Sequence, residues 1–141
     1  MKISIPIIVI QVEGGGYHLL VKSRFNSFVG GYLIIDTGAS MSAFDKDTCM
    51  PFSEEIFLVS EIQSSGVTSE SLHAKPVHIK KVYIGRFRFE INQAVVIDLN
   101  HIKQLYLQFS KKHIIGLLGS NFLKEHNAII DYKNNFLHLE L

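Results

Sequence analysis

The sequence predicts a mainly β fold with one or two short helices. Most segments are short runs of Ile, Val, Phe and Tyr separated by turn residues, a pattern typical of strands and hairpins. Hydrophobic residues make up 47% of the 141 residues and charged residues 19%, which excludes an intrinsically disordered protein. We expect a single domain over residues 1–141, because the length suits one domain and no repeat, low-complexity tract or linker divides the chain.

The first third of the chain predicts a hairpin and a buried strand. Residues 3–13 form the first predicted strand, the three glycines at 14–16 a turn, and residues 17–25 the returning strand. A second turn is expected at Gly30-Gly31, where two adjacent glycines precede the apolar strand at residues 32–35.

The remainder of the chain predicts two further hairpins and two helices. Residues 77–83 and 86–97 are expected to pair through a tight connection at Gly85. The final hairpin joins residues 128–132 to residues 136–141.

The first predicted helix begins at Asn100, a suitable N-cap. Its apolar positions at i, i+3, i+4 and i+7 are Ile102, Leu105, Tyr106 and Phe109. A shorter helix is expected over residues 120–126, and Asn127 is suited to the left-handed conformation that ends a helix.

An acidic residue, Asp36, follows the apolar strand at residues 32–35. A carboxylate in that position is costly to desolvate unless it is paired, hydrogen-bonded or functional. Gly38 permits a tight turn, and the hydroxyls of Thr37 and Ser40 could hold such a loop together. An Asp that merely begins a turn is an equally good interpretation of an isolated Asp-Thr-Gly.

Two protein classes place an Asp and a Gly after an apolar strand. Sugar kinases and actin-like ATPases need a second phosphate loop and two large lobes, for which 141 residues do not suffice. Residues 33–40 instead resemble the Asp-Thr-Gly-Ala-Ser signature of retropepsin-like aspartic peptidases. Residues 115–123, which include Leu117, Leu118 and Gly119, resemble the second element of that family, and residues 127–132 the strand that follows it. The resemblance extends over roughly residues 3–139.

The resemblance implies a single-lobe closed β-barrel with a flap hairpin, and the activity of an aspartic endopeptidase. In this family two Asp carboxylates hold one water and share one proton, so that one activates the water and the other protonates the oxyanion. This chain has one Asp-Thr-Gly. The resemblance therefore implies that a second copy supplies the other Asp36, in a homodimer with a two-fold axis through the active site.

The other acids lack the context of a catalytic Asp. Asp45 and Asp47 are expected in a polar loop, Asp98 at the entry to a helix or in a turn, and Asp131 at an exposed strand position. The resemblance implies that Asp36 is the catalytic residue, and none of these acids matches the family motif as a second catalytic Asp within the chain.

The resemblance also implies supporting roles for the residues after Asp36. Thr37 would donate a hydrogen bond across the dimer axis, and the backbone at Gly38 would hold the two carboxylates nearly coplanar. Ala39 offers no hydroxyl to the carboxylate, unlike the Ser that two-lobed relatives often carry there, so we expect a less acidic activity optimum than that of gastric enzymes. Ser40 completes the motif.

A flap is expected within residues 62–68. Ser64, Ser65, Gly66 and Val67 have the small, glycine-containing composition of a mobile tip, and lids of this kind exclude water when they close. A serine-rich surface loop explains the composition equally well. The distance after Asp36 favours the flap.

Composition argues against several partners and cofactors. The net charge is +1 and no run of Lys or Arg occurs, so neither nucleic acid nor an anionic membrane is an expected partner. The seven histidines lack the spacing of a metal site, and we expect no metal and no cofactor. A lone Cys49 and an apolar run of only residues 7–10 near the start favour a cytoplasmic protein.

The expected partners are a second copy of the chain and an extended peptide or protein substrate. One alternative is a catalytically weak or inactive dimeric relative that binds extended peptides by main-chain pairing. A second alternative is a structural module whose terminal strands interleave with a partner. The intact motif at residues 36–40 favours the enzyme.

Overall fold

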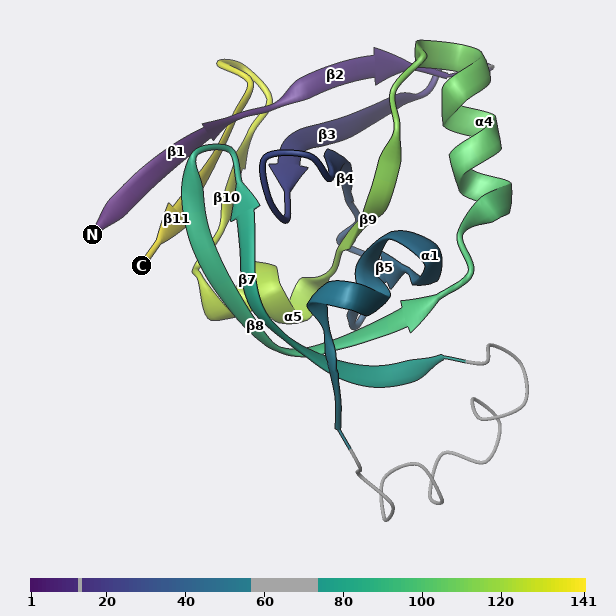
Figure 1. Cartoon of the computed structure of the whole chain (residues 1–141). Helices are drawn as coiled ribbons and strands as arrows, with labels where there is room; N and C mark the ends of the chain where they lie inside the picture. The colour runs from purple at the N-terminus through teal and green to yellow at the C-terminus, as the bar shows by residue number, and fades with distance from the viewer. Residues whose placement is uncertain (13, 57–73) are drawn as a thin grey trace.

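The computed structural model describes residues 1–12, 14–56 and 74–141 and confirms the mainly β fold (Figure 1). The strands are β1 (Lys2–Pro6), β2 (Ile8–Gln11), β3 (Tyr17–Arg24), β4 (Gly30–Ile35), β5 (Ser42–Asp45), β6 (Glu54–Glu55), β7 (Lys75–Ile84), β8 (Phe87–Ile97), β9 (Ile114–Leu118), β10 (Ile129–Asp131) and β11 (Phe136–Glu140). The helices are α1 (Lys46–Cys49), α4 (Asn100–Ser110) and α5 (Ser120–Glu125), with a 3-10 turn at Met50–Phe52.

The larger sheet closes on itself as a barrel. Its strands follow the order β2-β3-β4-β9-β5-β8-β7-β6, and β3 also pairs with β7. The ring therefore consists of β3, β4, β9, β5, β8 and β7. A smaller sheet, β1-β11-β10, brings the two termini side by side (Figure 1).

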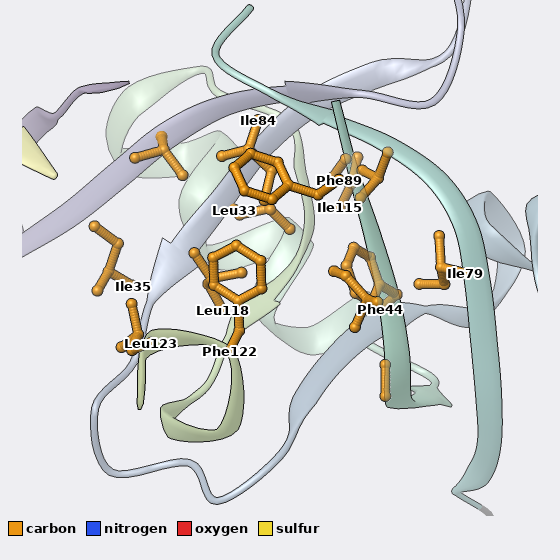
Figure 2. Close-up of a cluster of buried hydrophobic side chains, with 14 of the residues drawn as sticks. Leu33, Ile35, Phe44, Ile79, Ile84, Phe89, Ile115, Leu118, Phe122 and Leu123 are labelled. Carbon is orange, nitrogen blue, oxygen red and sulfur yellow. The ribbon is translucent and has the colours of Figure 1, made fainter. Parts of the chain in front are cut away.

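The barrel is filled by apolar side chains from every part of the ring. Leu33 of β4, Phe44 of β5 and Ile115 of β9 are fully buried in this core (Figure 2). Phe122 of α5 packs against the edge of Phe89 of β8, with ring centroids 5.2 Å apart. Helix α5 is thus anchored to the barrel by its buried face, and the loop before it is held in place.

One crossing connection shapes the functional end of the barrel. β9 lies between β4 and β5, parallel to β4 and antiparallel to β5. Because β4 and β5 are consecutive in the chain, the loop at residues 36–41 must cross the carboxyl end of β9. The residues that follow β9 therefore meet the Asp-Thr-Gly loop directly.

Two predictions about the first strands are wrong. The strand expected over residues 3–13 is two strands, because the chain leaves the smaller sheet at Pro6 and enters the larger one at Ile8. The expected turn at Gly30-Gly31 is instead the start of β4. Glycine is needed at position 31 because a Cβ there would overlap the backbone carbonyl of His113. These glycines serve close strand packing instead of a turn.

The later elements are close to prediction. Asn100 is the first residue of α4 and not its N-cap, and its backbone N–H donates to the Asp98 carboxylate at 2.9 Å. This agrees with the helix-entry role expected for Asp98. Asn127 has the left-handed φ of 47° expected after α5, and β10 pairs with β11 as the predicted final hairpin.

Candidate active site

Asp36 lies directly after β4, in a loop that organises itself around the carboxylate. The Asp36 N–H donates to the Leu118 carbonyl at 3.0 Å, which fixes the loop to the end of β9. Asp36 Oδ1 accepts a hydrogen bond from the Gly38 N–H at 3.0 Å, and the Ala39 N–H donates to the Asp36 carbonyl at 3.2 Å. The side chain is half-buried, so its position is defined while solvent still reaches it.

The second motif predicted from the sequence meets this loop. The Ser120 N–H donates to the Ala39 carbonyl at 2.7 Å, and a Cβ at Gly119 would lie 2.6 Å from the backbone of Met41. Leu118 supplies the carbonyl that receives the Asp36 N–H. Leu117, Leu118 and Gly119 therefore form the base on which the Asp-Thr-Gly loop rests, and glycine is required where the two backbones touch.

A hydrogen-bonded pair, the buried Ser42 and the half-buried Asn121, joins the two motifs further, and the sequence did not reveal it. Asn121 Oδ1 accepts hydrogen bonds from the Ser42 N–H at 2.9 Å and from the Ser42 hydroxyl at 3.0 Å. The Ser42 oxygen in turn accepts from the Gly119 N–H at 2.9 Å, and the Asn121 amide donates to the Gln93 carbonyl at 2.8 Å. Three segments of the chain, β5, β8 and the connection from β9 to α5, are thereby held in one arrangement next to the Asp36 loop.

The four residues after Asp36 lie together as predicted, and their environments differ. Thr37, Gly38 and Ser40 are exposed, and Ala39 is half-buried. Within the described residues the Thr37 hydroxyl makes no hydrogen bond, so it is available to a partner molecule. The roles expected of Thr37 and Gly38 across a dimer axis stay predictions.

A cavity of about 480 Å³ opens beside Asp36, within the range typical of ligand pockets. It is lined by Tyr17, His18, Leu19, Ile34, Ile35, Asp36, Thr37, Ile102, Leu105, Tyr106, Leu117, Ile130 and Tyr132. Among these described residues Asp36 is the one acidic side chain, and most of the others are apolar. The arrangement suits a catalytic or binding carboxylate at the edge of an apolar cleft.

Tyr106 of α4 links the helix to this site. Its side chain is buried, and its hydroxyl is hydrogen-bonded to Nδ1 of His18 on β3. Burial raises the pKa of Tyr106, and the negative charge of the nearby Asp36 raises it further. The phenol and the carboxylate are therefore close enough to interact electrostatically. The helical periodicity predicted an apolar face of α4, and three of its four residues, Ile102, Leu105 and Tyr106, line the cavity. The fourth, Phe109, is 38% exposed and lies outside the lining.

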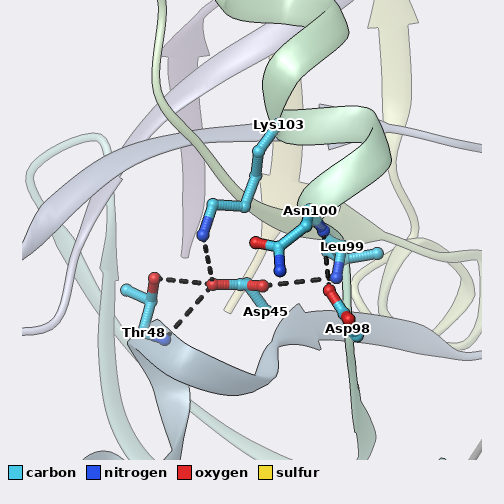
Figure 3. Close-up of polar contacts among 6 residues, drawn as sticks. All are labelled: Asp45, Thr48, Asp98, Leu99, Asn100 and Lys103. Carbon is cyan, nitrogen blue, oxygen red and sulfur yellow. Dashed lines mark hydrogen bonds and ion pairs between the residues drawn. The ribbon is translucent and has the colours of Figure 1, made fainter.

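Asp45 is not in a polar loop as expected from the sequence. It is the last residue of β5 and fully buried (Figure 3). Asp45 Oδ2 accepts hydrogen bonds from the Thr48 N–H and hydroxyl and pairs with Lys103 Nζ at 2.9 Å, while Oδ1 accepts from the Leu99 N–H at 3.3 Å. Burial favours the neutral acid, but these hydrogen bonds outweigh it and hold the pKa of Asp45 below its usual range.

Asp131 is not fully exposed as expected. It is half-buried and caps the final hairpin, accepting hydrogen bonds from the Asn134 side chain and N–H at 2.9 Å. These bonds and one to His138 lower the pKa of Asp131 to about 2. The carboxylate is committed to the turn and lines no part of the cavity.

The predicted flap tip, Ser64, Ser65, Gly66 and Val67, lies outside the described residues. Across residues 1–12, 14–56 and 74–141, no three His, Cys, Asp or Glu side chains lie close enough together to hold a metal ion. The same part of the chain has no helix that is long and apolar enough to cross a membrane.

Comparison with solved structures identifies the fold. A retropepsin-like aspartic protease from Rickettsia conorii matches with a TM-score of 0.53 and 22% identity, over 99% of this chain and 90% of its own. The retroviral protease-like domain of Ddi1 from Leishmania major matches with a TM-score of 0.57 and 20% identity, over 86% and 87% of the two chains. No family model and no curated protein matches the sequence. The chain therefore has the retropepsin-like fold predicted from its two motifs.

Proposed function

We propose that this protein is an aspartic endopeptidase whose active site forms between two copies of the chain, each contributing Asp36. The observation that carries the proposal is the position of Asp36: it is the one acidic side chain lining the apolar cavity among the described residues. Its loop rests on the Leu117-Leu118-Gly119 segment, as the sequence motif predicts. Of the two structures that share the fold, one is described as a retropepsin-like aspartic protease and the other as a retroviral protease-like domain, which supports the same activity.

The chemistry follows from two carboxylates that share one proton. The ionised Asp36 removes a proton from a water held between the two side chains, and the oxygen of that water attacks the peptide carbonyl carbon. The protonated Asp36 of the other copy donates to the carbonyl oxygen as the tetrahedral intermediate forms. The Asp36 that took the proton from water then donates it to the amide nitrogen, and the ionised Asp36 of the other copy takes a proton from a hydroxyl of the intermediate as the C–N bond breaks. The carboxyl and amine products leave, and the dyad again holds one proton.

The edge of the smaller sheet supports a second copy as the partner. β10 is an outer strand of the order β1-β11-β10, and its edge away from β11 is unpaired within the described chain. Ile129 and Tyr132 are 63% and 65% exposed there, although both are large and apolar. Tyr132 also lines the cavity of Asp36, and a second hollow that shares Thr37 with that cavity is lined by Thr37, Ser120, Leu123, Lys124, Asn127 and Ala128. A copy docked on β10 would bring its own Asp-Thr-Gly loop towards this one.

The terminal strands argue against an interleaved structural module. β1 pairs with β11 of its own chain from Lys2↔Glu140 to Pro6↔Phe136, and the Leu141 N–H donates to the Met1 carbonyl at 2.8 Å. The termini are thus already paired within one chain, which argues against strands exchanged with a partner.

The proposal is tested by incubating the protein with a peptide library from pH 3 to 8. The matched variants are Asp36→Asn and Asp47→Asn, because Asp47 is an exposed acid outside the cavity. A hydroxyl-containing inhibitor that mimics the tetrahedral intermediate serves as a second control. We expect cleavage by the wild type and by Asp47→Asn, blocked by the inhibitor and absent in Asp36→Asn.

Two other outcomes are informative. Cleavage that survives Asp36→Asn would refute the mechanism. Peptides retained by the wild type without cleavage at any pH would favour the dimeric peptide-binding alternative.

A further inference from the structure

We propose that helix α4 selects the substrate, and that Leu105 is its specificity-determining residue for a bulky apolar side chain next to the scissile bond. The inference rests on the proposed function, because it concerns the same cleft. It identifies the part of the chain that determines substrate specificity, about which the catalytic motif gives no information.

The first argument is that α4 shares a cavity with the catalytic candidate. Ile102, Leu105 and Tyr106 line the same space of about 480 Å³ as Asp36 and Thr37. A peptide whose carbonyl lies at Asp36 therefore places a neighbouring side chain against this helix. In the chain, α4 connects β8 to β9. Figure 1 shows it beside the barrel, near the end to which β2 and β3 also extend.

The second argument is the chemistry of the wall. Leu19, Ile34 and Leu117 continue the apolar surface from the barrel strands to α4. The three lining residues of α4, Ile102, Leu105 and Tyr106, carry no charge, so a charged side chain packed against the helix would lose its hydration without an ion-pair partner on that wall. Aliphatic and aromatic side chains gain instead from the removal of apolar surface from water.

The third argument is that α4 is fixed at several points. Lys103 pairs with the buried Asp45 at 2.9 Å, and its side chain is only 16% exposed. One turn later, Tyr106 is hydrogen-bonded to His18 and packs with Leu20, Ile34 and Ile114. The helix is a wall of set position, so its side chains determine the depth of the subsite. A rigid wall discriminates by size because it does not move to admit a larger group.

Leu105 and Leu107 provide a matched pair for the test. Both are leucines on α4, and they are 46% and 45% exposed. Leu105 lines the cavity of Asp36, whereas Leu107 is absent from its lining. Substitution of either to Ala changes helix propensity and exposed apolar area by similar amounts. A difference in peptide selectivity between the two variants is therefore due to the position of Leu105 in the cavity wall.

The experiment compares kcat/KM for peptides that differ only in the residue before or after the cleaved bond, with Ala, Leu, Phe or Lys there. Wild type should prefer Leu over Ala by at least about 10-fold and cleave the Lys peptides least. Leu105→Ala should shift the ratio of Phe to Leu cleavage by about 10-fold towards the larger side chain. Leu107→Ala should leave that ratio unchanged. Equal ratios in the two variants would overturn the inference.

The outcome separates this inference from the proposed function. If wild type cleaves no peptide, the endopeptidase proposal fails, and the same peptides are then measured by calorimetric binding. A Phe-to-Leu binding preference that changes in Leu105→Ala and not in Leu107→Ala would still support α4 as the selecting element. Identical binding profiles for the two variants, with or without cleavage, would overturn it.

Discussion

Asp36 and Asp45 both lie where a barrel strand ends, yet their surroundings differ in nearly every respect. Asp45 is fully buried, and its two oxygens receive hydrogen bonds from Thr48, Leu99 and Lys103. Asp36 is half-buried, and among the described residues its carboxylate receives one hydrogen bond, from the Gly38 N–H of its own loop. One acid is saturated by partners from other elements, and the other borders a cavity.

The difference indicates what each carboxylate is for. A buried acid with several donors stabilises the fold, since its charge is fully compensated only when the distant elements are in place. An acid held by its own loop next to an apolar cleft keeps an oxygen for another molecule. The comparison predicts that substitutions of the two acids separate activity from stability.

The largest expected effect is the loss of peptide cleavage in Asp36→Asn. The amide retains an oxygen for the Gly38 N–H, so we expect the free energy of unfolding to change by no more than about 0.5 kcal/mol. Cleavage should fall by at least about 10²- to 10⁴-fold, below detection in the library assay, because the proposed general base is removed. Urea unfolding and a peptide assay on the same preparation measure both quantities. A large stability loss would mean that Asp36 is a structural acid like Asp45.

The next largest effect is the destabilisation of Asp45→Asn. This change leaves the ammonium of Lys103 with little solvent and no counter-charge, so we expect a loss of about 3 kcal/mol in urea unfolding. The double variant Asp45→Asn/Lys103→Met should lose less, because no uncompensated charge remains. An Asp45→Asn protein as stable as wild type would contradict the structural role.

A smaller effect is expected where the two backbones touch beneath Asp36. In Gly119→Ala the new Cβ would lie 2.6 Å from the Met41 backbone, and relief of that contact should cost about 1–3 kcal/mol and displace the Asp-Thr-Gly loop. Gly16→Ala is the control, since its Cβ would meet only a Val12 methyl at 3.7 Å. Unfolding and cleavage of both variants are measured, and equal behaviour would contradict the close-packed base of the site.

The smallest effect concerns acid stability. The folded-state pKa of Asp45 lies below its unfolded value, so its contribution is full above about pH 4 and is lost as the pH falls through the folded pKa. Unfolding measured from pH 7 down to pH 2 should therefore show a shallower acid-side loss in Asp45→Asn than in wild type. Asp131, with a pKa of about 2, also stabilises the folded state less as the pH falls. The free energy of unfolding of Asp45→Asn should therefore still decrease with falling pH, but less steeply. Asp47→Asn should keep the wild-type slope, and a shallower one there would count against this assignment.

The sequence predicted the parts of the site that are local in the chain. Residues 36–40 follow an apolar strand directly, and residues 117–119 lead into a short helix, so both motifs are visible as continuous patterns. Their contact through Leu118 and Gly119 follows from the fold that these motifs indicate, and the structure confirms that fold.

The parts that the sequence did not predict depend on residues distant in the chain. The partner of Asp45 is Lys103 on another element, and neither residue carries a local signal of burial. Ile3, Ile5 and Ile7 are all buried, so the alternation of apolar residues typical of one strand continues past Pro6. This alternation does not indicate that β1 ends at Pro6 and that β2 begins in the other sheet. Paired glycines are equally typical of a turn and of two strands in close contact. At Gly31 the reason for glycine is the close backbone carbonyl of His113, which is distant in the sequence.

The central claim, that one chain supplies half of an active site, is tested most directly by specific activity over a dilution series, with sedimentation at the same concentrations. We predict that activity per chain falls in step with the dimer fraction and vanishes where sedimentation finds only monomer. Full activity per chain in solutions that contain only monomer would contradict the claim, because a single Asp36 would then be sufficient for catalysis.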